Sequence, residues 1–221
     1  MLIKKEPLSQ LHRQIDSMYG ITAEEKEALS SVYPAVLEKM EKCFSRISNK
    51  YYQRDREAYF DPLHTGQWTV FLYTAAHLLI RGSEKNRELC DKLYGLSKCV
   101  SSADIYYEVE MPEVWFFDHP QGSVMGRAEY GGYFAFSQGC TVGNSKGRYP
   151  KIGPYVVMYS DSKILGDCRI GDHVILSANA FIMDREIPSC SIVYGTHPDN
   201  RIVSLPLEKI EELQSAIFMI G

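Results

Sequence analysis

The chain has 221 residues, of which 45% are hydrophobic and 24% charged, and its formal net charge is −4. This length allows one large domain or two small ones. The acidic balance offers no basic surface for nucleic acid, and the absence of an 18-residue apolar run argues against a transmembrane helix. The N-terminal residues lack the apolar segment of a secretory signal. The six cysteines form no CxxC pair, so we expect a reducing, cytoplasmic setting without disulfides or structural zinc.

The first hundred residues predict an α-helical domain, residues 1–100. Thr22 and Glu25 form a capping-box signal ahead of a long amphipathic stretch, which we expect Pro34 to interrupt. The mostly apolar segment 66–80 follows, and it predicts a buried helix that ends at the next glycine.

From Asp104 onward the hydrophobic period changes to six residues. A helix repeats every 3.6 residues and a strand every 2, so a period of six fits neither. It is typical of a left-handed parallel β-helix, in which every sixth residue points into a narrow prism. Between residues 152 and 182 every sixth residue is aliphatic or methionine, namely Ile152, Met158, Ile164, Ile170, Leu176 and Ile182. When each of these is counted as the first residue of a hexad, the fifth positions carry Val156, Ser162, Cys168, Val174 and Ala180.

These patterns predict an α+β fold with three parts. A helical domain over residues 1–100 precedes a β-helix over residues 101–203. The tail, residues 204–221, predicts a short amphipathic helix that begins at Pro206 and caps the open end of the prism.

The six-residue register breaks twice, and such breaks correspond to loops that leave the prism, where function concentrates. The first break falls within residues 118–122 and contains His119, which could be catalytic or structural. The second break lies between Val142 and Ile152. It is rich in glycine and basic residues, which suit either an anionic ligand or a solvated hairpin.

Four segments together resemble the serine acetyltransferase family: SADIYY, FFDHPQGSVMG, GCTVGNSKGRYPKIG and SKILGDCRIGDHV. The resemblance covers roughly residues 96–203. The family's V-D-I-H aspartate and L-D-H histidine lie fifteen residues apart, as Asp104 and His119 do here. The family motif R-H-P-K-I is present with Tyr149 in place of the histidine. The family's G-A-G-A before K-I-L-G is replaced by the bulkier, more polar segment 159–162.

The resemblance implies an acetyl-CoA-dependent O-acetyltransferase that acts on L-serine or a related small amino acid, in cysteine biosynthesis, without a metal. His119 would be the general base, and Asp104 would orient its imidazole. By the same resemblance, four residues would bind the acceptor. They are Asp118 and Asp61 at its amino group, Arg148 at its carboxylate, and Tyr149 beside them.

The resemblance also implies a site for acetyl-CoA between neighbouring subunits of a homotrimer or a dimer of trimers. Ser160 and Ala178 would line the acetyl-CoA channel. The backbone N–H near Gly143 is a candidate donor to the oxyanion.

Other readings stay open at this stage. The same chemistry could act on a sugar hydroxyl or amine in surface polysaccharide synthesis, to which Tyr149 would offer a hydroxyl and a ring face. A zinc enzyme of the γ-type carbonic anhydrase kind would need three convergent histidines. The repeat region offers only His119, His173 and His197 for that role. A non-catalytic assembly scaffold is the last alternative.

Overall fold

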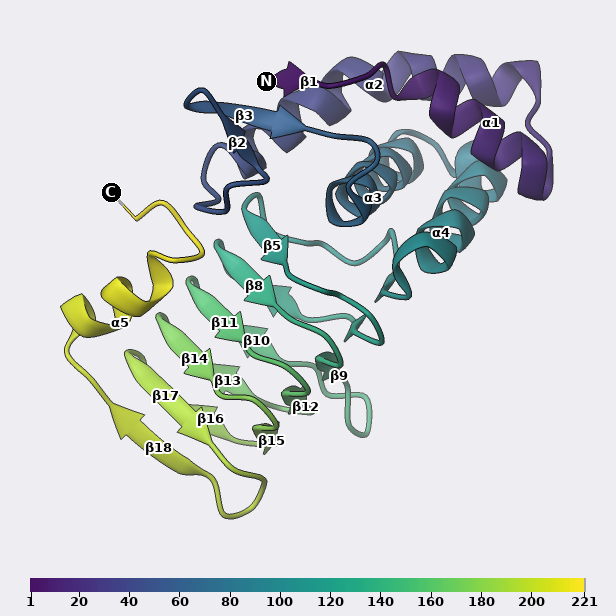
Figure 1. Cartoon of the computed structure of the whole chain (residues 1–221). Coiled ribbons are helices and arrows are strands. Elements are labelled where there is room, and N and C mark those ends of the chain that lie inside the picture. Colours follow the sequence, from purple (N-terminus) through teal and green to yellow (C-terminus); the bar gives the residue numbers. More distant parts are fainter. Residues whose placement is uncertain (221) are drawn as a thin grey trace. The chain divides into compact units, whose positions relative to one another are not determined.

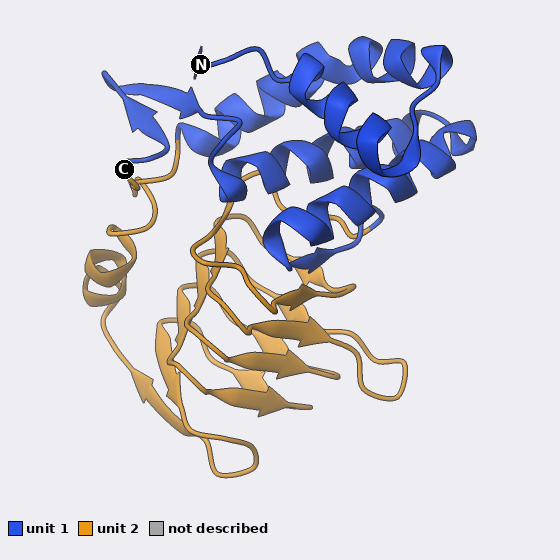
Figure 2. Cartoon of the chain, turned by 45° about the vertical axis from the view of Figure 1, so that its right-hand side comes forward, with its two compact units in different colours: residues 1–45, 50–108 blue, residues 46–49, 109–221 orange. Residues whose placement is uncertain are grey.

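The computed structural model describes residues 1–220, which form two compact units (Figure 2). The helical unit contains Met1–Ser45 and Lys50–Glu108, and the β-helix unit contains Arg46–Asn49 and Val109–Gly221. The short segment 46–49 joins the second unit because Ile47 forms an antiparallel bridge with Phe218.

The helical unit combines helices with a small sheet. Its helices are α1 (Leu8–Tyr19), α2 (Ala23–Phe44), α3 (Thr65–Gly82), the 3-10 turn η1 (Glu84–Asn86) and α4 (Arg87–Ser101). Its strands are β1 (Leu2–Ile3), β2 (Gln53–Arg54), β3 (Glu57–Phe60) and β4 (Asp104–Ile105). β3 lies between β1 and β2, parallel to the first and antiparallel to the second.

The start of α2 agrees with the sequence, but its predicted interruption was wrong. Thr22 and Glu25 form the expected capping box, each side chain accepting from the other's backbone N–H. The helix then continues through Pro34. A proline removes one backbone hydrogen bond, and buried side chains on both sides of it, such as Leu29 and Val36, hold the helix across the gap. The buried helix predicted from segment 66–80 is α3, which ends at Gly82 as expected.

The helical unit extends past the predicted domain end at residue 100. Tyr107 donates its hydroxyl to Asp91 Oδ1 at 2.7 Å, and Arg87 of α4 pairs with Glu108 at 3.0 Å. These contacts keep the segment after α4 with the helices, so the two units divide after Glu108.

The β-helix unit is built from short strands that stack coil upon coil (Figure 1). They are β5 (Trp115–Phe117), β6 (Val124–Met125), β7 (Glu129–Tyr130), β8 (Phe134–Phe136), β9 (Thr141–Gly143), β10 (Lys151–Ile152), β11 (Val156–Met158), β12 (Lys163–Leu165), β13 (Arg169–Ile170), β14 (Val174–Leu176), β15 (Phe181–Met183), β16 (Glu186–Ile187), β17 (Ser191–Tyr194) and β18 (Arg201–Ser204).

Three parallel sheets form the faces of the prism. One contains β5, β8, β11, β14 and β17, with β18 antiparallel at its edge; it is called the wide sheet below. The others contain β6, β9, β12 and β15, and β7, β10, β13 and β16. Val156 of β11 pairs across to Phe134 of β8, and Met158 pairs with Leu176, 18 residues later (176 − 158). One regular coil therefore takes 18 residues, or three hexads.

The predicted core of the prism is confirmed. Every sixth side chain from Ile152 to Ile182 is at most 4% exposed. The fifth-position side chains from Val156 to Ala180 are fully buried beside them. Small and β-branched side chains at the fifth position leave room for the larger aliphatic that follows, which is why the pattern closes into a dense core.

The C-terminal tail takes a different path from the predicted one. After β18 the chain forms α5 (Leu207–Gln214), which starts after Pro206 as expected. Gln214 then donates Nε2 to the carbonyl of Tyr155 at 2.6 Å, and its Oε1 lies 3.0 Å from Nδ1 of His173. Tyr155 and His173 are corner residues of successive coils, so α5 lies along the side of the prism rather than over its end (Figure 1).

Candidate active site at the register breaks

The first register break forms a tight turn directly after β5. The backbone N–H of Asp118 donates to the carbonyl of Phe136 at 3.1 Å, and that of Gln121 donates to the carbonyl of His119 at 2.9 Å. His119 adopts a left-handed conformation, with φ of 50°. The turn directs the side chain of His119 away from the prism, and this side chain is 77% exposed.

The turn pairs an imidazole with a carboxylate. Nε2 of His119 lies 3.6 Å from Oδ1 of Asp118. A carboxylate at this distance stabilises an imidazolium, and the open face of the ring leaves it accessible to a ligand. The pair is therefore suited to accept and return a proton.

The second register break forms a hairpin after β9, closed by a bridge between Ser145 and Arg148. The guanidinium of Arg148 donates Nη2 to Asp184 Oδ2 at 2.9 Å, and its Nη1 lies 3.9 Å from Asp167 Oδ2. The backbone N–H of Asp167 donates to the other oxygen of Asp184 at 2.8 Å. Arg148, which is predicted to bind the acceptor's carboxylate, therefore already pairs with Asp184 and lies close to Asp167, two acids of the coils that follow.

Sequence reasoning missed both acids. A Cβ on Gly166 would lie 2.2 Å from Asp184 Oδ1, so only glycine, here with φ of 78°, allows the carboxylate to sit there. The signal for Asp184 was weak because its partner lies 36 residues earlier in the chain. Tyr149, next to Arg148, is exposed and presents its hydroxyl and ring at the surface.

Asp104 lies in the helical unit, where α4 supplies its partners. The hydroxyl of Tyr94 donates to Oδ1, and Lys98 Nζ donates to Oδ2 at 2.9 Å. The hydrogen bond to Asp104 raises the pKa of Lys98, while burial and that same carboxylate raise the pKa of Tyr94. The carboxylate is held by a phenol and an ammonium, and its role towards His119 stays a prediction.

Asp61 also lies in the helical unit and is paired. Its Oδ2 accepts from Lys4 Nζ at 2.7 Å, and its Oδ1 accepts from the backbone N–H of Leu63 at 3.0 Å. Partial burial acts to raise the pKa of Asp61, but the bonds from Lys4 and Leu63 outweigh it and lower that pKa. Binding of an acceptor amine by Asp61 stays a prediction.

The three residues predicted to contact acetyl-CoA lie on the prism. Ser160 and Ala178 follow β11 and β14 at the same corner, one coil apart, and the backbone N–H of Asn179 donates to Ser160 O at 2.8 Å. Gly143 ends β9, and its carbonyl accepts from the N–H of Gly166 at 3.0 Å. Ser160 and Ala178 are therefore brought together, and their part in cofactor binding stays a prediction.

A cavity of about 160 Å³ lies on the outer face of the wide sheet, beside the first register break. Asp118 is its charged lining residue, and Asn49, Ser137 and Tyr159 add polar groups. The remaining lining residues are Phe116, Ala135, Phe136, Val157, Met158, Ala216 and Ile217. The cavity combines polar and apolar lining residues, and its carboxylate, Asp118, is the chain neighbour of the exposed His119, so it is a candidate site for a small molecule.

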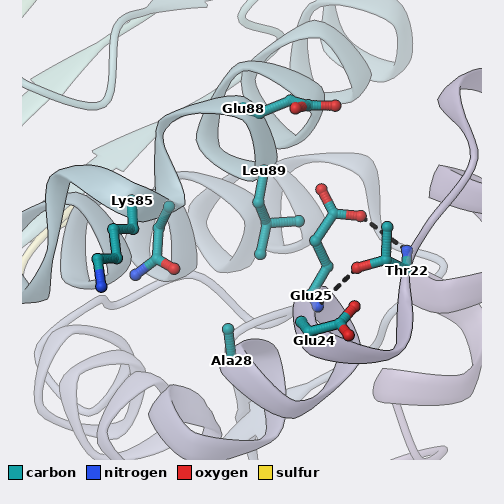
Figure 3. A pocket seen from close by; sticks show the side chains of 8 residues that line it. Thr22, Glu24, Glu25, Ala28, Lys85, Glu88 and Leu89 are labelled. Atoms are coloured by element: carbon teal, nitrogen blue, oxygen red, sulfur yellow. Dashed lines mark hydrogen bonds between the residues drawn. The ribbon is translucent and has the colours of Figure 1, made fainter.

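A second cavity, of about 300 Å³, lies in the helical unit between the start of α2 and the segment from η1 into α4. Glu24, Glu25 and Glu88 line it together with Lys85 (Figure 3). Glu25 is engaged by the capping box, as the dashed lines show, and by Lys92 at 2.7 Å. Its acids thus have structural partners, and the cavity contains none of the predicted site residues.

Among residues 1–220, no group of three or more histidine, cysteine or acidic side chains is arranged to hold a metal ion. None of the described helices is long and apolar enough to cross a bilayer.

No family model matches the sequence. Individual proteins do match it in sequence, and the three described here are all named serine acetyltransferase. The chain is 28% identical over 158 residues to a serine acetyltransferase of Helicobacter pylori, a match that covers 66% of this chain and 92% of that protein. It is 31% identical over 127 residues to a serine acetyltransferase of Staphylococcus epidermidis, covering 54% and 59%. A match to the protein of the same name from Synechococcus elongatus, at 27% identity, spans 60% of that relative's length.

Solved structures share the fold. The serine acetyltransferase of Neisseria gonorrhoeae superposes with a TM-score of 0.67 at 22% identity, covering 94% of this chain and 83% of that one. That of Brucella abortus gives a TM-score of 0.67 at 19% identity, covering 90% and 83%. The likeness confirms the predicted helical region followed by a left-handed parallel β-helix. The relatives in sequence and the neighbours in structure that are named here are all serine acetyltransferases, and this chain is similar to them in sequence and in fold.

Proposed function

We propose that this protein is an acetyl-CoA-dependent O-acetyltransferase whose acceptor is the hydroxyl of L-serine. The observation that carries the proposal is the exposed His119–Asp118 pair on a turn of the hexapeptide prism. The names of the relatives in sequence support this activity. A structural neighbour was solved in complex with CoA and another with serine, which supports the choice of both substrates.

The chemistry needs one base and no covalent enzyme intermediate. An imidazole nitrogen of His119 takes the proton of the acceptor hydroxyl as its oxygen attacks the thioester carbonyl. A C–O bond forms, the C–S bond then breaks, and the imidazolium returns its proton to the leaving CoA sulfur. Asp118, 3.6 Å from Nε2, stabilises the imidazolium between the two proton transfers.

Replacing the base tests the proposal directly. His119→Ala is expected to lower kcat by roughly two to four orders of magnitude, the range usual for loss of a general base. The measurement is release of free CoA thiol from acetyl-CoA in the presence of L-serine. The KM for acetyl-CoA and the melting temperature should stay unchanged, since the side chain lies exposed on a turn. Full activity in His119→Ala would remove this histidine from the mechanism.

We also propose that the chain acts as at least a trimer in the cytoplasm. The resemblance to the family implies an acetyl-CoA site between subunits, and free cysteine thiols are compatible with a reducing compartment. Multi-angle light scattering at micromolar protein is expected to give at least three times the mass of one chain. A monomer that is fully active would contradict a shared site.

One observation favours a second acceptor class. Arg148 already pairs with Asp184 and lies near Asp167, so an acceptor carboxylate meets an acidic neighbourhood. A sugar hydroxyl carries no negative charge, so these two acids do not repel it. The exposed Tyr149 offers the sugar a ring face. An acceptor screen with acetyl-CoA across L-serine, L-homoserine and amino sugars separates the two classes by turnover.

A further inference from the structure

A further cavity on the outer face of the wide sheet contains none of the predicted site residues. Its volume is about 160 Å³, and it is lined by Tyr159, Ile175, Ser177, Ile192, Tyr194 and Leu213. None of these side chains is charged, and their only polar groups are hydroxyls. The cavity is therefore suited to an uncharged, largely apolar group.

Three of the lining residues are neighbours across the sheet, at the ends of β11, β14 and β17 (Figure 1). The N–H of Tyr159 donates to the carbonyl of Leu176 at 3.0 Å, and that of Ser177 donates to the carbonyl of Val193 at 2.9 Å. Leu176 and Val193 point into the core, so the residue after each points outward. Tyr159, Ser177 and Tyr194 therefore stand in a row, and the small serine leaves a gap between two rings that are 42% and 40% exposed. This gap is called the tyrosine slot below.

The opposite ends of the same strands show how rings on successive coils pack. Tyr133, Tyr155 and His173 directly precede β8, β11 and β14, and their rings stack with centroids 4.4 and 4.5 Å apart. This separation is close to the roughly 4.8 Å between neighbouring strands, so each coil contributes one layer to the stack. In the tyrosine slot the middle coil carries a serine in place of a ring. The space of one flat ring therefore lies between the two tyrosines.

The ring of Tyr194 is supported on its far side. Arg201 of β18 lies opposite Tyr194, and its guanidinium carbon is 5.8 Å from the ring centroid, within the range of a cation–π contact. β18 adjoins β17 on the side away from β14, and Arg201 does not line the cavity. The face of the ring towards Ser177 is therefore left open. The arginine also places a positive charge beside the slot, and this charge attracts an anionic group.

The lining indicates a flat ligand with a polar edge. An engineered cavity of about 150 Å³ holds benzene. A cavity of about 160 Å³ therefore admits one ring system and excludes a whole coenzyme. Every nucleobase has a face that stacks on an aromatic side chain. The hydroxyl of Ser177 makes no hydrogen bond to residues 1–220, so it is available to the edge of a base. A base with an attached phosphate matches the two rings, this hydroxyl and the charge of Arg201 together.

We propose that the tyrosine slot binds the base of a purine nucleotide, stacked between Tyr159 and Tyr194 over Ser177, with Arg201 near its phosphate. Both a free nucleotide and the nucleotide end of CoA carry such a base. The site goes beyond the proposed function, because it involves neither His119 nor the acceptor. It is also particular to this chain, since Tyr159 opens the segment 159–162 that replaces the G-A-G-A motif of the family.

The first test removes one wall of the slot. Calorimetry with adenosine monophosphate should show binding to the wild type. Tyr194→Leu is expected to raise the dissociation constant at least fivefold, because leucine has no flat face on which a base stacks. Tyr194→Phe keeps the ring and should stay within about twofold of the wild type. Tyr19→Leu is the matched control, because Tyr19 is 44% exposed on α1 in the helical unit. Equal dissociation constants for Tyr194→Leu and Tyr19→Leu would overturn the proposal.

The second test fills the slot. Ser177→Tyr places a third ring between the two tyrosines, as in the column of Tyr133, Tyr155 and His173. Its melting temperature should therefore equal or exceed that of the wild type, while binding of adenosine monophosphate is lost. Ser177→Ala keeps the slot open and should weaken binding only about tenfold or less, through one lost hydrogen bond. A folded Ser177→Tyr variant that binds like the wild type would place the ligand elsewhere.

The third test separates the two sources of the base. If the base is that of CoA, Tyr194→Leu should raise the KM for acetyl-CoA at least fivefold and leave unchanged the KM for acetyl-pantetheine, which lacks the nucleotide. If a free nucleotide is the ligand, Tyr194→Leu should weaken adenosine monophosphate while both of these KM values stay unchanged.

The outcome does not depend on serine acetylation. If no acetyl transfer is detected, calorimetry with CoA and with adenosine monophosphate still compares the wild type with Tyr194→Leu, so the slot is tested although the proposed function has failed. Absence of binding of both ligands to the wild type would overturn the slot and leave the proposed function untouched. A smaller mass of Tyr194→Leu in light scattering would then mean that this face joins copies of the chain.

Discussion

At the scale of single residues, Arg148 has carboxylate partners before any ligand arrives. Its Nη2 lies 2.9 Å from Asp184, and its Nη1 lies 3.9 Å from Asp167. A guanidinium has five N–H donors, so this arrangement leaves donors for an acceptor carboxylate. The two acids hold the planar group in one orientation and also reduce its net charge. An amino-acid acceptor would share the arginine with them.

Removing Arg148 tests whether the acceptor carries a carboxylate. Arg148→Ala is expected to raise the KM for L-serine at least tenfold, since a hydrogen bond to a charged group contributes about 1.5–3 kcal/mol. The KM for acetyl-CoA should stay within a few-fold. Steady-state kinetics with both substrates varied gives the two constants.

The control for this prediction is Arg185→Ala. Arg185 lies in the same unit and donates to the carbonyl of Pro198 at 3.3 Å, a contact that does not involve Arg148. If the two variants have the same acceptor KM, Arg148 has only a structural role. The loss of stability should then be small, because an exposed ion pair contributes about 0–1 kcal/mol.

Site residues that are close together in the sequence could be predicted, whereas those that only the fold brings together could not. His119 attracted notice because a local break in the register marks a loop, and the roles predicted for His119 and Asp118 came from the neighbouring family motif L-D-H. Asp184 was not found, because its contact with Arg148 exists only once coils of the prism stack. Ala216 was missed for the same reason: its part in a cavity depends on the path of a tail whose anchors lie in other coils.

At the scale of elements, the hexad pattern predicted the prism because each core position repeats within a few residues. The helical unit followed its sequence less closely. Capping by Thr22 was correct, whereas α2 passed through Pro34 because buried neighbours on either side stabilise it. Local signals start a helix, but packing decides whether it continues.

Leu176 tests how much the prism depends on its inward aliphatic side chains. It is fully buried in β14, between coils that pair through β11 and β17. Leu176→Ala is expected to lower the free energy of unfolding by about 2–5 kcal/mol, through lost burial and the cavity left behind. Urea denaturation followed by near-ultraviolet circular dichroism measures this. Arg169→Ala, at an exposed position of β13, should change the value by less than about 0.5 kcal/mol.

At the scale of the whole molecule, the six cysteines divide by burial. Cys43, Cys90, Cys140 and Cys168 are buried, Cys190 is half-buried and Cys99 is exposed. Burial raises the pKa of Cys90 to about 12, and burial also raises the pKa values of Cys140 and Cys168. A raised pKa reduces the thiolate fraction at a given pH, and the thiolate is the reactive form.

A thiol reagent should therefore distinguish these cysteines in the native protein. At about pH 8 we expect Cys99 to react first, and Cys140 and Cys168 to react only after unfolding. A disulfide reagent followed by absorbance gives the rates, and Cys99→Ser should remove the fast phase. Labelling of Cys140 or Cys168 as fast as Cys99 would mean that the prism opens in solution.

The division between the two units was the least accessible feature from sequence. The period of six begins near Asp104, yet residues up to Glu108 stay with the helices through Tyr107 and Arg87. Residues 46–49 join the β-helix unit although the chain around them is helical or part of the small sheet. Both assignments depend on contacts between distant segments, which periodicity does not encode.

The corner of the prism that holds the tail is a column of flat rings. Tyr133 stacks on Tyr155 at 4.4 Å between centroids, and Tyr155 stacks on His173 at 4.5 Å. Phenol transitions held parallel at this separation couple to one another, and the edge of Phe218 fixes the local asymmetry around them. We therefore expect that detachment of the segment around Phe218 from these rings changes the near-ultraviolet circular dichroism of tyrosine, so that the movement can be followed without an attached dye.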